Sequence, residues 1–151
     1  MRVSAKADYA VRAAIELAAA PDAPLKGERI ATAQGIPLKF LENILGELKH
    51  AGLVQSQRGS EGGYWLARPA DEVTLAEIIR AAEGPLASVR GERPEVLDYR
   101  GAAEPLQTVW IALRASIRAV LESVTLANLV DDDLPAGVGA LLELPEAWEP
   151  H

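Results

Sequence analysis

The most restrictive feature of the sequence is a short turn between two helical patterns. The first helix of the pair is expected over residues 26–34, and Gln34-Gly35-Ile36-Pro37 forms the turn. Pro37 can occupy the first turn of the second helix, where its missing N–H costs nothing. Two helices joined in this way have the proportions of a helix-turn-helix. The second helix would bury residues that recur three or four positions apart: Leu38, Leu41, Ile44, Leu45 and Leu48.

The flanking segments complete a winged helix-turn-helix. An amphipathic helix is predicted over 4–20, ahead of the pair. Two β-capable runs, 53–57 and 63–67, flank the loop Arg58-Gly59-Ser60-Glu61-Gly62, whose glycines permit a hairpin. This hairpin is the expected wing. The fold class predicted is therefore mainly α-helical with a small two-stranded β wing.

A further helix closes this first domain. Thr74 and Glu77 form a T-x-x-E capping box at its start, and Gly84-Pro85 ends it. The chain is then expected to divide into a DNA-binding domain, a connector, a dimerisation helix and an acidic C-terminal extension, at residues 1–84, 85–104, 105–130 and 131–151.

The helical pattern returns after the connector, with an apolar face wider than one small domain needs. Two-fold symmetric dimers are the commonest oligomers, so we expect a homodimer built on this helix of roughly twenty residues. Whether apolar residues of the extension, such as Leu141 and Trp148, pack on the body stays open. The expected dimerisation residues are Val109, Trp110, Leu113, Ile117, Val120, Leu121 and Val124.

The charge distribution bears on nucleic-acid binding. The net charge is −7, but residues 1–66 hold eight basic against seven acidic side chains, whereas residues 67–151 hold seven against fifteen. The N-terminal half can therefore present a basic face, while its modest charge predicts weak non-specific binding that depends sharply on salt.

Several classes of function find no support in the sequence. There is no cysteine for a thiolate metal site, a disulfide or a nucleophile. No apolar run approaches the roughly eighteen residues of a membrane span, so we expect a soluble, cytoplasmic protein without a membrane partner. An enzyme would have to use carboxylates such as Glu92 or Asp98, and no catalytic motif accompanies them.

Four stretches form an ordered set: SAKADYAVRA, GIPLKFLENILGELKHAGLV, RGSEGGYWLARP and VTLAEIIRAAEGPL. Over about residues 1–126 the chain resembles the Rrf2 family of bacterial transcriptional regulators. The resemblance implies a winged-helix domain followed by a long dimerisation helix, in agreement with the patterns above.

The connector departs from the family pattern. The resemblance implies that sensing members hold an iron–sulfur cluster with three connector cysteines, and this chain has none. Asp8 aligns with an accessory carboxylate ligand of some relatives, but Asp8 and His50 cannot replace three thiolates. The four-residue spacing instead favours a stack along one helix, in which Arg12 lies between the carboxylates of Asp8 and Glu16. We therefore expect no metal and no cofactor.

The second helix of the pair carries the expected base-reading residues. Lys39, Glu42 and Asn43 lie near its N-terminus and opposite the leucines, where such helices meet the major groove. Glu42 can accept from cytosine N4, Asn43 can pair with adenine, and Lys39 can contact phosphate or guanine. The resemblance also implies a base-reading role for Glu42.

The loop of the wing supplies a second set of DNA contacts. Arg58 can enter the minor groove or bind a phosphate, and the glycines beside it allow close approach. Gln57, Ser60 and Tyr64 are secondary candidates for phosphate contacts, although Tyr64 can equally belong to the hairpin core. Glu61 departs from the family pattern and places a negative charge near DNA.

These patterns predict a dimeric regulator, more readily a repressor, on a pseudo-palindromic operator of double-stranded DNA. Its signal stays open between a small molecule, a protein partner and its own concentration. A pocket between the wing domain and the long helix would suit an effector. The alternative is a protein–protein interaction module with weak or lost DNA binding, which the acidic C-terminal half would suit.

Overall fold

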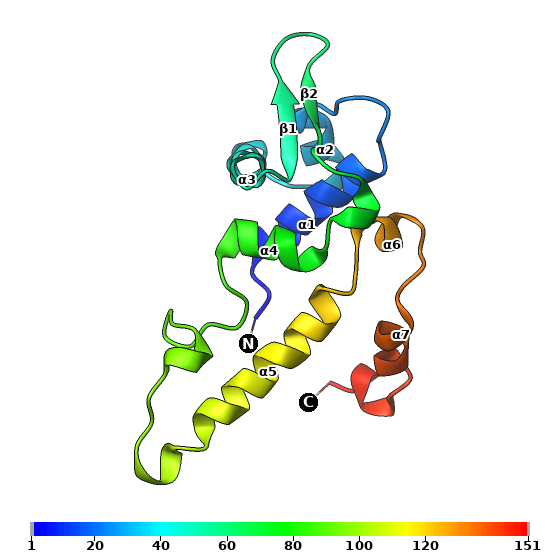
Figure 1. The fold of residues 1–151 in the computed structure, drawn as a ribbon. Helices are drawn as coiled ribbons and strands as arrows, with labels where there is room; N and C mark the ends of the chain where they lie inside the picture. Colours follow the sequence, from blue (N-terminus) through cyan, green and yellow to red (C-terminus); the bar gives the residue numbers. More distant parts are fainter. Residues whose placement is uncertain (1, 151) are drawn as a thin grey trace.

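The computed structural model describes residues 2–150, and its first three helices are the predicted amphipathic helix and the two helices of the predicted helix-turn-helix (Figure 1). These are α1 (Ala5–Ala18), α2 (Gly27–Gln34) and α3 (Leu38–His50). Ser4 caps α1 by accepting a hydrogen bond from the backbone N–H of Ala7 at 3.0 Å. Gly35 ends α2 in the left-handed region, with φ of 64°. Pro37 stands at the N-cap of α3, one position before its first turn.

The wing is an antiparallel hairpin of β1 (Val54–Gln57) and β2 (Gly63–Leu66). Two glycines are required where the chain returns. A Cβ on Gly62 would lie 2.1 Å from the Gln57 carbonyl oxygen, and one on Gly63 would lie 2.6 Å from that of Leu25. Only glycine allows the two backbones to approach so closely.

The wing leads through a 3₁₀ turn, η1 (Ala70–Glu72), into α4 (Leu75–Glu83). The predicted capping box is confirmed: the Thr74 hydroxyl accepts from the Glu77 N–H, and the Glu77 carboxylate accepts from the Thr74 N–H. Gly84 then ends α4. The two reciprocal bonds satisfy backbone donors that the first turn would otherwise leave unpaired.

The hydrophobic core lies around α1, which packs against α3, α4 and α6. Leu38 does not belong to it: this residue is 36% exposed at the start of α3, although the spacing placed it on the buried stripe. The largest fully buried core side chains are Leu17, Ile30, Leu41, Ile44, Leu45, Leu48, Ile78 and Leu126.

The long helix differs from its prediction. The single helix expected over 105–130 is two helices, α5 (Leu106–Leu121) and α6 (Leu126–Val130). Thr125 and Asn128 form a second capping box, which starts a new helix and so ends the first. Val124, expected on the dimer face, is 3% exposed inside the subunit.

The connector runs through two further 3₁₀ turns, η2 (Pro94–Val96) and η3 (Gly101–Ala103). It reaches the start of α5, which lies as a rod below the winged domain (Figure 1). Gln107 of α5 holds the connector by donating to the carbonyls of Pro94, Glu95 and Leu97 at 3.3, 3.2 and 2.8 Å.

The extension folds into α7 (Ala136–Leu142) and η4 (Pro145–Trp148). None of residues 131–150 is buried, and Trp148 is 72% exposed. In the single chain, therefore, Leu141, Leu142, Leu144 and Trp148 of the extension stay exposed and Val138 is half-buried. No helix within residues 2–150 has the length and apolar character needed to cross a membrane.

Candidate nucleic-acid interface

The outer face of α3 carries the three predicted base-reading residues. Lys39, Glu42 and Asn43 are all exposed. Gly46 and Lys49, at the following helical positions, continue this face along α3 and are also exposed. Sequence reasoning missed Lys49, although its spacing from Lys39 and Glu42 was visible. The result is a continuous polar stripe of two lysines, a carboxylate and an amide.

The position of α3 is fixed from both sides. Its inner face is fully buried in the core through Leu41, Ile44, Leu45 and Leu48. Its start is held by Phe40, whose ring meets the Tyr9 ring edge-on at a centroid distance of 5.7 Å. A helix packed in this way presents its outer face in one fixed orientation relative to the rest of the winged domain.

A polar network ties α1 to the helix-turn-helix. Arg12 Nη1 bonds to Asp8 Oδ2 at 3.0 Å, as the spacing predicted, and Arg12 Nε donates to Gln34 Oε1 at 3.0 Å. Glu16 does not pair with Arg12, because it accepts from the Gln34 amide instead. Asp8 and Glu16 therefore serve this network at the end of α2.

The wing presents three of its four predicted contact residues to solvent. Gln57, Arg58 and Ser60 are exposed. Tyr64 is half-buried, packs on the core and pairs by its backbone with Leu25. Its hairpin-core role is thus the one visible in the structure. Glu61 is exposed on the same loop.

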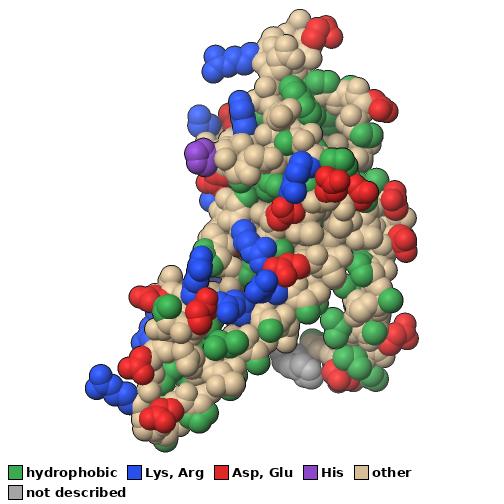
Figure 2. Space-filling model, viewed as in Figure 1, with side chains coloured by type: hydrophobic (Ala, Val, Ile, Leu, Met, Phe, Trp, Pro, Cys, Tyr) green, Lys and Arg blue, Asp and Glu red, His purple; other side chains and the backbone are tan. Residues whose placement is uncertain are grey.

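Two lysines connect the wing to the helices beside it. Lys26, at the N-cap of α2, donates to the Gly59 carbonyl in the wing loop. Lys49 of α3 donates to Ser56 Oγ at 2.8 Å. The wing loop and α3 lie toward the same end of the molecule, where Figure 2 shows Lys and Arg side chains at the wing tip and beside α3.

The predicted dimerisation face of α5 is unburied in the single chain. Val109 is 53% exposed, and no residue of α5 is buried. Trp110 donates from Nε1 to the Tyr99 hydroxyl at 3.0 Å, so its polar edge belongs to the connector. The remaining predicted residues of the helix are half-buried: Leu113, Ile117, Val120 and Leu121.

The connector offers no donor set for an iron–sulfur cluster. The chain contains no thiolate, and within residues 2–150 no three His, Asp or Glu side chains gather where they could hold a metal ion. Its carboxylate Glu95 is paired with Arg114. Cluster irons need thiolates, so these residues do not fit such a group.

Comparison with known proteins agrees with this geometry. The model of the Rrf2 family, described as iron-dependent transcriptional regulators, matches residues 3–132. A protein of Mycobacterium tuberculosis strain H37Rv, named as an HTH-type transcriptional regulator, is 50% identical over 150 residues, covering 99% of this chain and 93% of its own length.

Solved structures show the same fold. The global cysteine regulator CymR of Bacillus subtilis superposes with a TM-score of 0.74 at 34% identity, over 87% of this chain and 98% of its own. IscR of T. potens gives 0.72 at 32% identity, over 100% and 93%. The matching proteins are regulators and not enzymes, and the chain belongs to the Rrf2 family of winged-helix transcriptional regulators.

Proposed function

We propose that this regulator binds a specific DNA sequence as a homodimer, with α3 in the major groove and the wing on the flanking backbone or minor groove. The observation that carries the proposal is the exposed stripe of Lys39, Glu42 and Asn43 on a helix whose opposite face is fully buried. An α-helix fits the major groove, and these side-chain types can read base edges there.

The wing supports the same placement. Arg58 is exposed on the wing loop, and this loop lies toward the same end of the molecule as α3 (Figure 1). A guanidinium there can neutralise a phosphate or enter the minor groove. Contacts of this kind set the register in which α3 meets the bases.

The partly exposed apolar face of α5 supports the homodimer. Val109 is 53% exposed, and the half-buried Leu113, Ile117 and Val120 on the same side of the helix keep part of their apolar surface in contact with water. A second α5, related by a two-fold axis, would bury them. Such a dimer would present two copies of α3 to a pseudo-palindromic operator.

The proposed regulator works in the cytoplasm without an iron–sulfur cluster, because its connector lacks the thiolates that would hold one. A dimer that holds two DNA-reading helices on one operator regulates most simply by occupying a promoter. We therefore propose that it represses transcription. The name of its CymR relative describes a global cysteine regulator, and the genes under the present protein's control are to be found by experiment.

Fluorescence anisotropy of the protein on the promoter of its own gene, over a salt series, tests this function. Arg58→Ala should weaken binding about ten-fold and reduce the slope of log affinity against log salt by about one. Arg100→Ala is the matched control, because Arg100 is exposed on the connector. An unrelated duplex should bind much more weakly than the promoter.

A negative result would distinguish the second candidate function. If every duplex binds feebly and Arg58→Ala changes nothing, a selection from genomic fragments decides whether another operator exists. No enriched fragment would overturn DNA binding. The interaction-module alternative, with its acidic extension as the contact surface, would then stand.

A further inference from the structure

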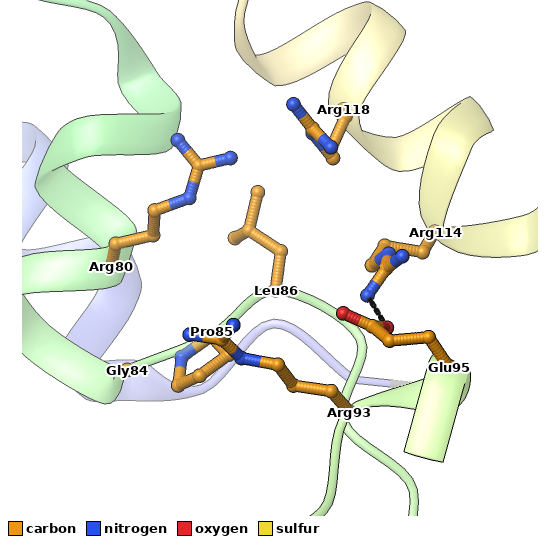
Figure 3. A pocket seen from close by; sticks show the side chains of 8 residues that line it. All are labelled: Arg80, Gly84, Pro85, Leu86, Arg93, Glu95, Arg114 and Arg118. Atoms are coloured by element: carbon orange, nitrogen blue, oxygen red, sulfur yellow. Dashed lines mark hydrogen bonds and ion pairs between the residues drawn. The ribbon is translucent and has the colours of Figure 1, made fainter. Parts of the chain in front are cut away.

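A pocket of about 480 Å³ lies between the winged domain and the long helix (Figure 3). Three segments enclose it: the end of α4, the connector and the middle of α5. This is the position where the sequence suggested an effector would fit. The lining residues are Arg80, Gly84, Pro85, Leu86, Arg93, Glu95, Arg114 and Arg118.

The pocket holds more positive than negative charge. Arg80 and Arg118 share the carboxylate of Glu122, with Arg118 Nε at 2.9 Å, and Arg114 pairs with Glu95. Arg93 forms no salt bridge with any residue of the described chain, 2–150. Four guanidiniums therefore face two carboxylates.

This charge surplus persists at physiological pH. Hydrogen bonds from its own backbone N–H and from Arg114 lower the pKa of Glu95, and those from Arg118 and Arg80 lower the pKa of Glu122. Both carboxylates therefore stay ionised, and guanidiniums do not deprotonate in proteins. The four arginines therefore leave a surplus of two positive charges at the pocket, although Arg93 is the only one of them without a salt bridge within residues 2–150.

The floor of the pocket is apolar. Leu86, which is 8% exposed, stands among the four arginines in Figure 3, with Pro85 beside it. The volume exceeds what an inorganic ion fills and lies within the range of small-molecule sites. The pocket thus joins an anion-binding rim to a surface for a small organic group.

The backbone beside the pocket is strained. Ala87 and Arg90 adopt φ of 52° and 55°, a region that costs a non-glycine residue about 1 kcal/mol or more. Gly84 and Gly91 also have positive φ. Strain of this kind gathers at ligand sites and switch regions, where the surrounding structure maintains it.

We infer that this pocket is an effector site for a small metabolite bearing a doubly charged oxyanion group, a phosphate or a sulfate. The surplus of two positive charges matches the charge of such a group, and arginine forks bind its oxygens in pairs. The organic part of the ligand lies on Leu86 and Pro85.

Ligand binding would act on DNA affinity through the elements that the arginines join. Arg80 belongs to α4 of the winged domain, whereas Arg114 and Arg118 belong to α5. An anion held by both would bias the angle between the winged domain and the dimer helix, and so the spacing of the two copies of α3. This regulatory step rests on the proposed DNA-binding function, whereas anion binding itself does not.

Isothermal titration calorimetry of the full chain without DNA tests the site. The probes are inorganic phosphate, inorganic sulfate and adenosine 5′-monophosphate, with acetate as a singly charged control at matched ionic strength. Arg93→Ala and Arg118→Ala should each weaken phosphate or sulfate binding at least ten-fold. Arg100→Ala, which removes a connector arginine outside the pocket, should leave it unchanged.

The outcomes separate the sources of the anion. Tighter binding of the monophosphate ester than of free phosphate assigns the site to an organic ligand, and equal binding assigns it to the inorganic ion. Absence of saturable binding by phosphate, sulfate and the ester, or an equal loss in Arg100→Ala, overturns the inference.

Anisotropy on the operator, with and without the probe that binds, then tests regulation. A several-fold change in DNA affinity that Arg93→Ala abolishes supports the effector role. If the variants instead weaken DNA binding and lower its salt dependence while the anion does not bind, the arginines contact the duplex and the inference fails. DNA binding without anion binding leaves the proposed function intact.

Discussion

Glu42 lies on the proposed DNA-contacting face of α3, where attraction between basic side chains and phosphate does not account for a carboxylate. A carboxylate on the outer face of α3 repels the DNA backbone, yet it can accept a hydrogen bond from cytosine N4. We predict that Glu42→Ala strengthens binding to unrelated DNA and removes about 1–3 kcal/mol of discrimination at one base pair. Competition anisotropy with operators altered at single base pairs measures this.

The control for Glu42 is Glu104→Ala, which removes an exposed carboxylate on the connector. It should leave both affinity and discrimination unchanged. A uniform loss across all altered operators in Glu42→Ala would contradict base reading by this residue, since it would point to a general effect on α3.

Two glycines give opposite predictions for stability. An alanine Cβ at Gly62 would lie 2.1 Å from the Gln57 carbonyl oxygen, whereas one at Gly46, inside α3, would have no atom within 4 Å. Gly62→Ala should lower the free energy of unfolding by about 1–3 kcal/mol. Gly46→Ala should raise it by about 0.5–1 kcal/mol, because alanine loses less entropy in a helix. Urea unfolding of both variants checks the pair, and equal effects would refute the steric argument.

At the scale of elements, the capping box of α4 links stability to pH. Burial opposes ionisation of Glu77, but hydrogen bonds from the Thr74 N–H and from Arg68 together outweigh it, and its pKa is lowered from 4.5. A carboxyl whose pKa is lower in the folded state stabilises the fold above its unfolded pKa. That contribution is lost as the pH falls through the folded pKa, below about 4.5.

Two substitutions separate the charge of Glu77 from its capping role. Glu77→Gln keeps an oxygen for the Thr74 N–H, so the free energy of unfolding at pH 7 should fall by less than about 1 kcal/mol, with a shallower decline in acid. Glu77→Ala removes the cap as well and should cost about 1 kcal/mol more. Thermal unfolding between pH 3 and pH 7 measures both variants. If stability declines with falling pH as steeply in Glu77→Gln as in the parent protein, Glu77 is not the group responsible.

The apolar face of α5 predicts a dimer that can be broken without unfolding the subunit. Leu113 and Ile117 are half-buried and lie outside the hydrophobic core, so Leu113→Glu and Ile117→Glu should leave the core intact. In the proposed dimer each would leave a buried unpaired charge, worth about 3–5 kcal/mol, so sedimentation should show a monomer. Ala115→Glu, on the opposite side of α5, is the control. A double variant that stays dimeric would place the interface elsewhere.

The elements differ in how much the sequence could predict. Buried leucines and a T-x-x-E box identify α3 and α4 because both signals are local. The end of α5 was not predicted, because Val124 continues the apolar spacing of the helix. The capping box that starts the next helix, Thr125 with Asn128, has asparagine in place of the usual glutamate. Local cap chemistry there overrides hydrophobic spacing.

The arginine pocket lay beyond sequence reasoning for a different reason. Arg80, Arg93 and Arg114 come from three segments whose meeting depends on how the connector folds back onto α5. No spacing rule relates them. The DNA-contacting residues of α3 and the wing were predictable because each set lies within one short segment, and the structure places both at one end of the molecule.

For the whole molecule, the division of charge indicates how affinity is distributed. Most acidic side chains, fifteen of twenty-two, follow residue 66, whereas α3 and the wing loop precede it. One subunit therefore contributes few phosphate contacts, and specific binding depends on two subunits acting together. Two subunits make twice the phosphate contacts and release twice the counterions, so the affinity for DNA should fall steeply as the salt concentration rises. Occupancy of the operator should also rise steeply with protein concentration.

Half-site spacing is the property that only the dimer can determine. Two copies of α3 held by a rigid α5 pair reach half-sites about one helical turn apart on the same face of the duplex. Inserting about 5 base pairs between the half-sites turns one of them to the opposite face, since a turn takes about 10–10.5 base pairs. We predict that this insertion reduces affinity to that of a single half-site, whereas replacing the same number of central base pairs without changing the length has a small effect. Anisotropy on the three duplexes measures this, and equal affinity for all three would mean that each winged domain binds DNA independently of its partner.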